Sequence, residues 1–221
     1  MIQLGSIVAV MWLYRAKIAT VLAGLGSDRD AQRFALMVLV ACVPALVAGA
    51  FFSDYVKTVL YESPRVIAGA FVAGGIAMLL VERFRPVPTV AHADRTPIAK
   101  AFGVGLCQML ALVPGVSRSG ATIVGGMVMG LDRAAAAELS FFVAMPTLTA
   151  AFAHEAYETR SHLAPDRAFE IAIGLVMAFV ASAVVVRPFL EFVGRAGFSS
   201  FAWYRIAAGL AIFGAVAAGW L

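Results

Sequence analysis

The feature that most constrains the fold is an apolar stretch of 31 residues, 101–131, which carries a single charge, Arg118. A continuous helix of that length would be roughly 46 Å long, whereas the apolar core of a bilayer is about 30 Å thick. Pro114 and Gly115 interrupt the stretch near its centre. Proline removes a backbone donor and glycine frees the backbone to turn. The sequence therefore predicts a re-entrant pair of half-helices over 101–131 that returns to the side from which it entered.

The composition indicates that nearly the whole chain lies in a membrane. Of its 221 residues, 62% are hydrophobic and only 14% are charged, and the mean hydropathy is +0.91. A soluble domain of this size is nearer half apolar and a quarter charged. We predict an all-α integral membrane protein with a single polytopic domain, residues 1–221. About six other segments should span the membrane, near residues 1–15, 34–52, 66–82, 134–154, 168–187 and 202–221.

The positive charges are distributed unequally over the two sides that this topology defines. Twelve lie on one side: Arg15, Lys17, Arg29, Arg33, Arg83, Arg85, Arg95, Lys100, Arg133, Arg187, Arg195 and Arg205. Four lie on the other: Lys57, Arg65, Arg160 and Arg167. Cytoplasmic loops are enriched in Lys and Arg, so the first side is predicted to be cytoplasmic and both termini to face outward. A complete crossing by 101–131 would reduce the asymmetry, so the charges also favour re-entry.

The predicted spans form two halves of opposite orientation, residues 1–83 and 100–221. Inverted repeats of this kind place a substrate site near the membrane midplane, at discontinuous helices. The second half begins with a re-entrant pair, whereas the first does not. Only 14 residues precede Arg15, which is roughly 21 Å of helix and shorter than a bilayer core. We therefore expect that Met1 lies inside the first helix of a longer protein and that the first re-entrant pair is missing.

The residues around the break have the chemistry of a phosphate site. An ionisable residue at membrane depth is costly and is a functional-site hypothesis by default, and a guanidinium matches phosphate oxygens two at a time. A helix that restarts near Gly120 would direct free N–H groups and its positive dipole end at a bound anion. The small residues around Arg118 are Gly115, Ser117, Ser119, Gly120 and Thr122. The alternative is an ordinary kinked span in which Arg118 pairs with a buried carboxylate, and it leaves these donors without a purpose.

Other site chemistries have little support in the sequence. Cys42 and Cys107 both fall in apolar segments and lack the spacing of metal ligands, so no metal site is predicted among these residues. There is no glycine-rich nucleotide motif after a strand. The net charge of +4 does not indicate nucleic acid, because the basic residues fall in short loops where anionic lipid headgroups are their natural partners.

Residues 114–122, Pro-Gly-Val-Ser-Arg-Ser-Gly-Ala-Thr, resemble the signature of the undecaprenyl-diphosphate phosphatases, the bacitracin-resistance family. Residues 2–10, 107–112 and 137–146 are also similar to that family, so the resemblance covers essentially the whole chain. It implies a hydrolase of the bacterial inner membrane that removes the terminal phosphate of undecaprenyl diphosphate. Such a reaction recycles the lipid carrier of peptidoglycan synthesis. The resemblance therefore also implies roles in cell-wall biogenesis, cell shape and bacitracin resistance.

The resemblance assigns catalytic roles to Ser117, Arg118 and Thr122. We expect Arg118 to clamp the phosphate, and Ser117 and Thr122 to donate to its oxygens. The residues expected to bind substrate beside them are Gly115, Ser119, Gly120 and Glu138. Two interpretations of Glu138 remain open, because it starts the following helix and either pairs with Arg118 or lies at the cytoplasmic end of that helix.

The family also has an N-terminal re-entrant motif with paired glutamates and a histidine, which this sequence lacks. The general base and the ligands of a divalent cation, Mg²⁺ or Ca²⁺, are expected in that segment, so residues 1–221 alone should hydrolyse the lipid too slowly to matter. The expected partners are a polyprenyl diphosphate, membrane lipids and a second copy in a homodimer, and not nucleic acid. Two alternatives stay open: a transporter of an anionic or lipid-phosphate substrate, and a catalytically inactive form.

Overall fold

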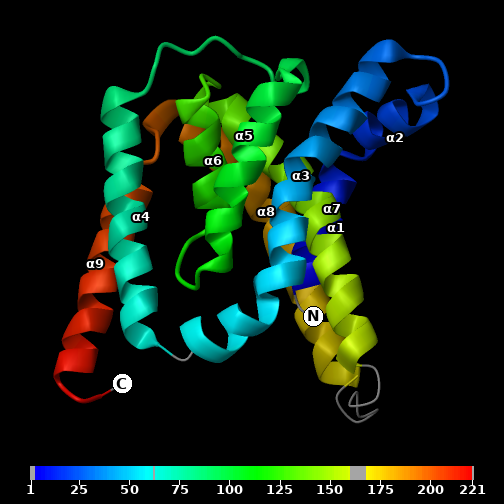
Figure 1. Cartoon of the computed structure of the whole chain (residues 1–221). Helices are drawn as coiled ribbons and strands as arrows, with labels where there is room; N and C mark the ends of the chain where they lie inside the picture. The colour runs from blue at the N-terminus through cyan, green and yellow to red at the C-terminus, as the bar shows by residue number, and fades with distance from the viewer. Residues whose placement is uncertain (1–2, 62, 160–167, 221) are drawn as a thin grey trace.

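A computed structural model describes residues 3–61, 63–159 and 168–220, and it is helical almost throughout (Figure 1). The α-helices are α1 (Gln3–Leu13), α2 (Arg15–Gly24), α3 (Arg29–Tyr55), α4 (Pro64–Phe84), α5 (Ile98–Met109), α6 (Arg118–Val128), α7 (Arg133–Thr159), α8 (Ala168–Ala196) and α9 (Ser199–Ala217). A π-helical turn follows α3, and short 3₁₀ turns lie at Ala93–Arg95 and Leu110–Leu112. No strand occurs in these three ranges, where the only extended pairing is an isolated bridge. The predicted all-α class is confirmed.

Five of these helices, α3, α4, α7, α8 and α9, are long and apolar enough to cross a membrane. A sixth crossing is obtained only if α1 and α2 count as one span, and they are bent by 72° at Tyr14. The predicted span 1–15 corresponds to α1, and a second helix, α2, follows the bend from Arg15 to Gly24. Arg15 and Lys17 end the apolar run, but they do not end the helix. No residue of α2 is buried against the rest of the described chain.

The stretch 101–131 forms the predicted re-entrant pair. Helices α5 and α6 lie side by side and antiparallel, and the turn between them points into the interior of the molecule (Figure 1). The two ends of the pair are joined by backbone hydrogen bonds: Thr89 N–H donates to Gly130 O at 2.8 Å, and Asp132 N–H donates to Val90 O at 2.9 Å. Because these residues flank the pair on either side, the chain leaves at the end where it entered.

The connecting segments are separated between the two ends of the molecule as the charge pattern predicts. Residues 25–28, 85–97 and 129–132 gather at one end, whereas the α3–α4 connection and the C-terminus lie at the opposite end (Figure 1). Two of the charges assigned to that second end, Arg160 and Arg167, fall outside the described residues. Met1, which was expected to lie inside the first helix, is also outside them.

Two of the predicted loop charges are placed incorrectly by the sequence reasoning. Arg187 lies within α8, which continues nine residues past the predicted end of its span, to Ala196. Arg205 lies in the second turn of α9 and is only 8% exposed. Apolar windows end where charges begin, but a helix continues as long as its backbone bonds and side-chain packing allow. Arg205 thus lies inside a candidate membrane-spanning helix rather than in a loop.

The third helix of each predicted half, α4 and α9, pack against each other along their length. Small residues make this approach possible. A Cβ atom added to Gly75 would lie 2.7 Å from the carbonyl oxygen of Ala202, and one added to Gly209 would lie 2.8 Å from that of Ala68. Close contact through small residues is the usual way in which membrane helices associate. The division into inverted halves stays a prediction.

Candidate active site at the hairpin tip

The tip of the α5–α6 hairpin is the break predicted from Pro114 and Gly115. Gly115 has φ of +91°, a conformation that glycine adopts readily and that is costly for other residues. The chain then extends to Ser117, which is the N-cap of α6. The Ser117 hydroxyl oxygen accepts a hydrogen bond from the Gly120 N–H at 3.1 Å, as capping serines do. The signature thus encodes a turn followed by a capped helix start.

This cap determines which backbone donors remain free. The Gly120 N–H, which the sequence suggested as a substrate donor, is already bonded to Ser117. The N–H groups of Arg118 and Ser119 make no hydrogen bond within the described chain, as is normal for a first helical turn. The available donors therefore lie one and two residues earlier than the glycine, next to the Arg118 side chain.

Arg118 is half-buried at the start of α6 and is not neutralised. Its Nη1 atom is buried and has no hydrogen-bond partner in the part of the chain that the structure describes. No ion pair to Arg118 is found there either. The guanidinium lies close enough to Cys42, in the middle of α3, for an electrostatic interaction. Pairing with a buried carboxylate, the alternative raised by the sequence, is not observed.

Glu138 does not contact Arg118. Its Oε1 atom lies 3.5 Å from Nζ of Lys17 in α2, and the same ammonium lies 3.9 Å from Oδ2 of Asp94. Of the two interpretations of Glu138, the structure favours the residue at the loop end of α7 over the partner of Arg118. A contact between Glu138 and Arg118 would have supported the predicted role of Glu138 in substrate binding, and the structure instead pairs Glu138 with Lys17.

The two remaining hydroxyls of the signature lie in different environments. Ser119 is exposed, and its Oγ lies 3.2 Å from that of Ser117. Thr122 is only 1% exposed, and its hydroxyl lies 2.7 Å from Ser140 Oγ in α7. The Thr122 hydroxyl also donates toward the carbonyl oxygens of Arg118 and Ser119, at 3.0 and 3.1 Å. Donation from Thr122 to a ligand would replace one of these contacts, so the structure gives it a supporting position.

The described residues do not supply the other parts of a hydrolytic site. No carboxylate or imidazole among them contacts the Ser117 hydroxyl, although a serine nucleophile needs an adjacent base. Nor do they contain a group of three or more His, Cys, Asp or Glu side chains that could hold a metal ion. The described residues therefore offer no such cluster of ligands for a divalent cation.

Two polar residues near the tip were missed as site residues by the sequence reasoning. Gln108, in the last turn of α5, is 2% exposed, and neither its Oε1 nor its Nε2 has a partner among the described residues. Arg205 donates from Nη2 to the carbonyl oxygen of Gly115 at 2.7 Å. The sequence contained a signal for each of them. Gln108 is a polar amide within an apolar half-helix, and Arg205 is a charge within an apolar span. Counting Arg205 as a loop charge concealed the second signal.

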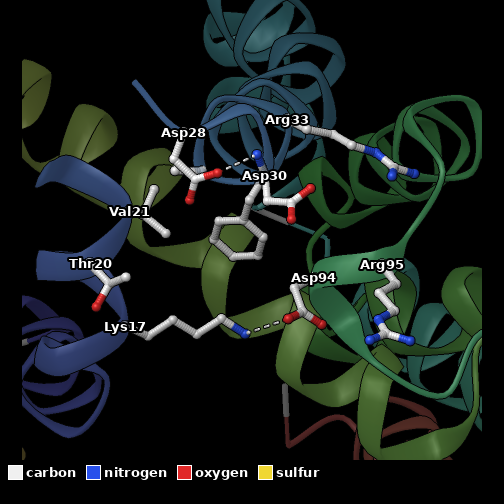
Figure 2. Close-up of a pocket in the computed structure, with 10 residues that line it drawn as sticks. Lys17, Thr20, Val21, Asp28, Asp30, Arg33, Asp94 and Arg95 are labelled. Atoms are coloured by element: carbon white, nitrogen blue, oxygen red, sulfur yellow. Dashed lines mark hydrogen bonds and ion pairs between the residues drawn. The ribbon is translucent and has the colours of Figure 1, made fainter. Parts of the chain in front are cut away.

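A separate hollow of about 560 Å³ lies at the loop end of the molecule, between α2, the start of α3 and the segment that contains Asp94 (Figure 2). It was not predicted. Three cations and three carboxylates line it: Lys17, Arg33, Arg95, Asp28, Asp30 and Asp94. Figure 2 shows Lys17 directed at Asp94 across the hollow. Its charges are balanced, in contrast with those at the hairpin tip.

Comparison with known proteins supplies the context for this geometry. The sequence profile of the family described as "Bacitracin resistance protein BacA" matches residues 1–211. An undecaprenyl-diphosphatase of Cereibacter sphaeroides is 45% identical over 219 residues, 99% of this chain and 82% of the relative. Undecaprenyl-diphosphatase 1 of Agrobacterium fabrum is 46% identical over 209 residues, 95% and 78% of the two chains. The undecaprenyl-diphosphatase of Paracoccus denitrificans is 42% identical over 220 residues, 100% and 82% of the two chains.

Proposed function

Because this chain belongs to the bacitracin resistance protein BacA family, we propose that it hydrolyses undecaprenyl diphosphate to undecaprenyl phosphate and phosphate, with the diphosphate bound at the hairpin tip. The name of its relatives, undecaprenyl-diphosphatase, gives the reaction and the substrate. The observation that carries the site is the unpaired guanidinium of Arg118 at the start of α6. The product would be the lipid carrier that serves peptidoglycan synthesis.

The electrostatics of the tip support an anionic ligand. Arg118 is partly buried and its Nη1 atom has no partner among the described residues, so the guanidinium loses part of its hydration, and a bound anion would offset that cost. A diphosphate brings several negative charges and can accept two hydrogen bonds from one guanidinium. The free N–H groups of Arg118 and Ser119 and the positive end of the α6 dipole favour the same ligand. The orphaned amide of Gln108 is available as an additional polar contact.

These groups also suit the transition state of phosphoryl transfer. Charge accumulates on the transferring and leaving oxygens, and positioned cations and N–H donors supply most of the stabilisation. We assign that role to Arg118, with Ser117 and Ser119 placing hydroxyls beside it and Thr122 supporting the first turn of α6. Among the described residues, no carboxylate or imidazole contacts the Ser117 hydroxyl to act as its general base.

The apolar helices make this a multi-pass membrane protein. We propose the bacterial inner membrane as its location, with both termini outside and residues 85–97 in the cytoplasm, as the positive-inside rule favours. A homodimer and a bound divalent cation, Mg²⁺ or Ca²⁺, are further proposals that rest on the family resemblance alone.

The function is tested by measuring phosphate release from a polyprenyl diphosphate by the protein as its native membrane contains it, together with any residues that precede Met1. The unsubstituted protein should release phosphate, and Arg118→Ala should lose at least about 100-fold in kcat/KM while its melting temperature is unchanged. Transport of the lipid into proteoliposomes without phosphate release would favour the transporter instead. Near-normal turnover by Arg118→Ala would contradict the proposed site.

The orientation is tested by labelling single cysteines in intact cells, in a background with Cys42→Ala and Cys107→Ala. His92→Cys, in the α4–α5 connection, should be protected from an impermeant maleimide, whereas Tyr61→Cys, at the opposite end, should react. The reverse pattern would place the termini in the cytoplasm. Labelling of both cysteines from outside would contradict the separation of the two ends.

A further inference from the structure

Arg205 is a second intramembrane charge, and it lies at the same depth as the hairpin tip. A Cβ atom added to Gly74, the middle residue of α4, would lie 2.7 Å from Nη2 of Arg205, so the guanidinium occupies the space above that glycine. No ion pair to Arg205 is found among the described residues. A charge at that depth is costly and is usually retained for function.

The guanidinium is bound by backbone oxygens from two different elements. Nη2 of Arg205 donates to Gly115 O at 2.7 Å and to Ala70 O at 3.3 Å. The guanidinium carbon lies 4.8 Å from the centre of the Phe71 ring, within the range of a cation–π interaction. Arg205 therefore connects α9 and α4 to the turn of the hairpin, three residues before Arg118.

The close packing of α4 and α9 does not account for this residue. Their backbones already approach through Gly75 and Gly209, with added Cβ atoms 2.7 and 2.8 Å from carbonyl oxygens of the facing helix. An apolar side chain of similar size at position 205 would fill the same space without a desolvated charge. The guanidinium of Arg205 therefore serves its hydrogen bond to the carbonyl oxygen of Gly115 rather than the packing of the two helices.

We propose that Arg205 is a positioning residue, which holds the turn 113–117 against α4 so that the first turn of α6 presents Arg118 and its free N–H groups to the diphosphate. The guanidinium also donates a hydrogen bond to the carbonyl oxygen of Gly115, whose partial negative charge would otherwise repel an anion. This proposal rests on the proposed function. A displacement of about 1 Å in such a turn is enough to cost roughly 100-fold in rate.

The test compares three variants of the protein purified from its native membrane. Arg205→Met removes the bonds to Gly115 and Ala70. Gly74→Ala retains the arginine but puts a methyl group where its guanidinium lies. Gly69→Ala is the matched control on the same helix, because its added Cβ would meet only Phe213, at 3.9 Å. For each variant, kcat and KM for a polyprenyl diphosphate, the melting temperature and hydrogen exchange of the amides of residues 113–117 are measured.

Arg205→Met should lower kcat by about 10-fold to about 100-fold, with a melting temperature within a few degrees of the unsubstituted protein. The amides of residues 113–117 should exchange about tenfold faster. Gly74→Ala should shift kcat and exchange in the same direction, and Gly69→Ala should leave both unchanged. Arg205→Lys should recover part of the activity, since an ammonium can reach one of the two carbonyl oxygens.

An Arg205→Met protein with normal kcat and normal exchange would overturn the proposal. A fall in melting temperature that parallels the loss of kcat in Arg205→Met and Gly74→Ala would also overturn it, because that pattern marks a purely structural contact. Failure of the unsubstituted protein to release phosphate would instead count against the proposed function, while the exchange measurement would still test the bond to the turn.

Discussion

The hairpin tip and the hollow at the loop end both contain cations, but only the cations of the hollow have carboxylates beside them. In the hollow, three cations face three carboxylates, and Lys17 pairs with both Asp94 and Glu138. At the tip, Arg118 and Arg205 have no carboxylate partner within the described chain. Arg205 donates from Nη2 to backbone oxygens, although its buried Nε has no partner among the described residues, and the buried Nη1 of Arg118 has no partner there either.

This difference distinguishes a surface whose charges are balanced within the protein from a site whose positive charge is available to an anionic ligand. Paired charges near water contribute little energy and need no further partner. An unpaired guanidinium away from water is costly, and an anion of matching geometry removes the cost. The hollow is a cavity of about 560 Å³, but the charge distribution points to the tip as the binding site. The two regions therefore make opposite predictions for the same kind of substitution.

The largest expected contrast comes from replacing arginine by lysine in each region. Arg118→Lys keeps the charge but loses the planar fork, so phosphate release should fall by about 100-fold. Arg95→Lys, in the hollow, should change release by less than about twofold. Steady-state assays on a polyprenyl diphosphate measure both. Equal effects of the two substitutions would remove the distinction between the regions.

A loss of comparable size is expected when the hydroxyl of Ser117 is removed. Ser117→Ala should lower turnover by about 10-fold to about 1000-fold if the hydroxyl serves the transition state. The same change removes the cap of α6, which costs about 1 kcal/mol of stability. Ser117→Gly separates the two effects, because glycine caps nearly as well but has no hydroxyl. Recovery of turnover in Ser117→Gly would reduce Ser117 to a helix cap.

Thr122 should show a smaller, supporting effect. Thr122→Ala removes the hydroxyl that contacts Ser140 and two carbonyl oxygens, and we expect about a tenfold loss of turnover. Thr122→Ser retains the hydroxyl and should stay within about threefold of the unsubstituted protein. A deeper loss in Thr122→Ser than in Thr122→Ala would show that the methyl group, rather than the hydroxyl, matters.

The smallest effect belongs to the hollow. Lys17→Met removes the ammonium that pairs with Asp94 and Glu138, and these partly exposed pairs contribute at most about 1 kcal/mol each. Turnover should remain within about twofold, and the melting temperature should fall by a few degrees at most. A 100-fold loss of turnover would place substrate in the hollow and would restore a catalytic role to Glu138.

The parts of this molecule that follow from local sequence rules could be predicted. Length and the Pro114–Gly115 break were sufficient to predict the hairpin 101–131. The sequence also predicted a helix that restarts near Gly120, and the structure starts that helix at Arg118, with Ser117 as its cap. Both depend on neighbours within a few residues along the chain.

The missed features depend on contacts between distant segments. Arg205 was assigned to a loop because a charge normally ends a span, and only the approach of α9 to Gly115 shows how the charge is accommodated. Glu138 was placed beside Arg118 as one of two interpretations, but α2 folds back and brings Lys17 to it instead. The bend at Tyr14 that makes this possible is set by packing between α1, α7 and α8, which no local pattern records.

The most direct test of the central claim, that the unpaired guanidinium at the hairpin tip binds the diphosphate, is an equilibrium binding measurement. Dissociation constants for a polyprenyl diphosphate and for the uncharged polyprenol are determined with the unsubstituted protein, Arg118→Ala and Lys17→Ala. Loss of a buried charge pair costs about 2 to 5 kcal/mol, so Arg118→Ala should bind the diphosphate about 30-fold to about 4000-fold more weakly. The polyprenol should bind all three proteins alike, and Lys17→Ala should keep its affinity for the diphosphate. Unchanged diphosphate affinity in Arg118→Ala, or a comparable loss in Lys17→Ala, would contradict the account.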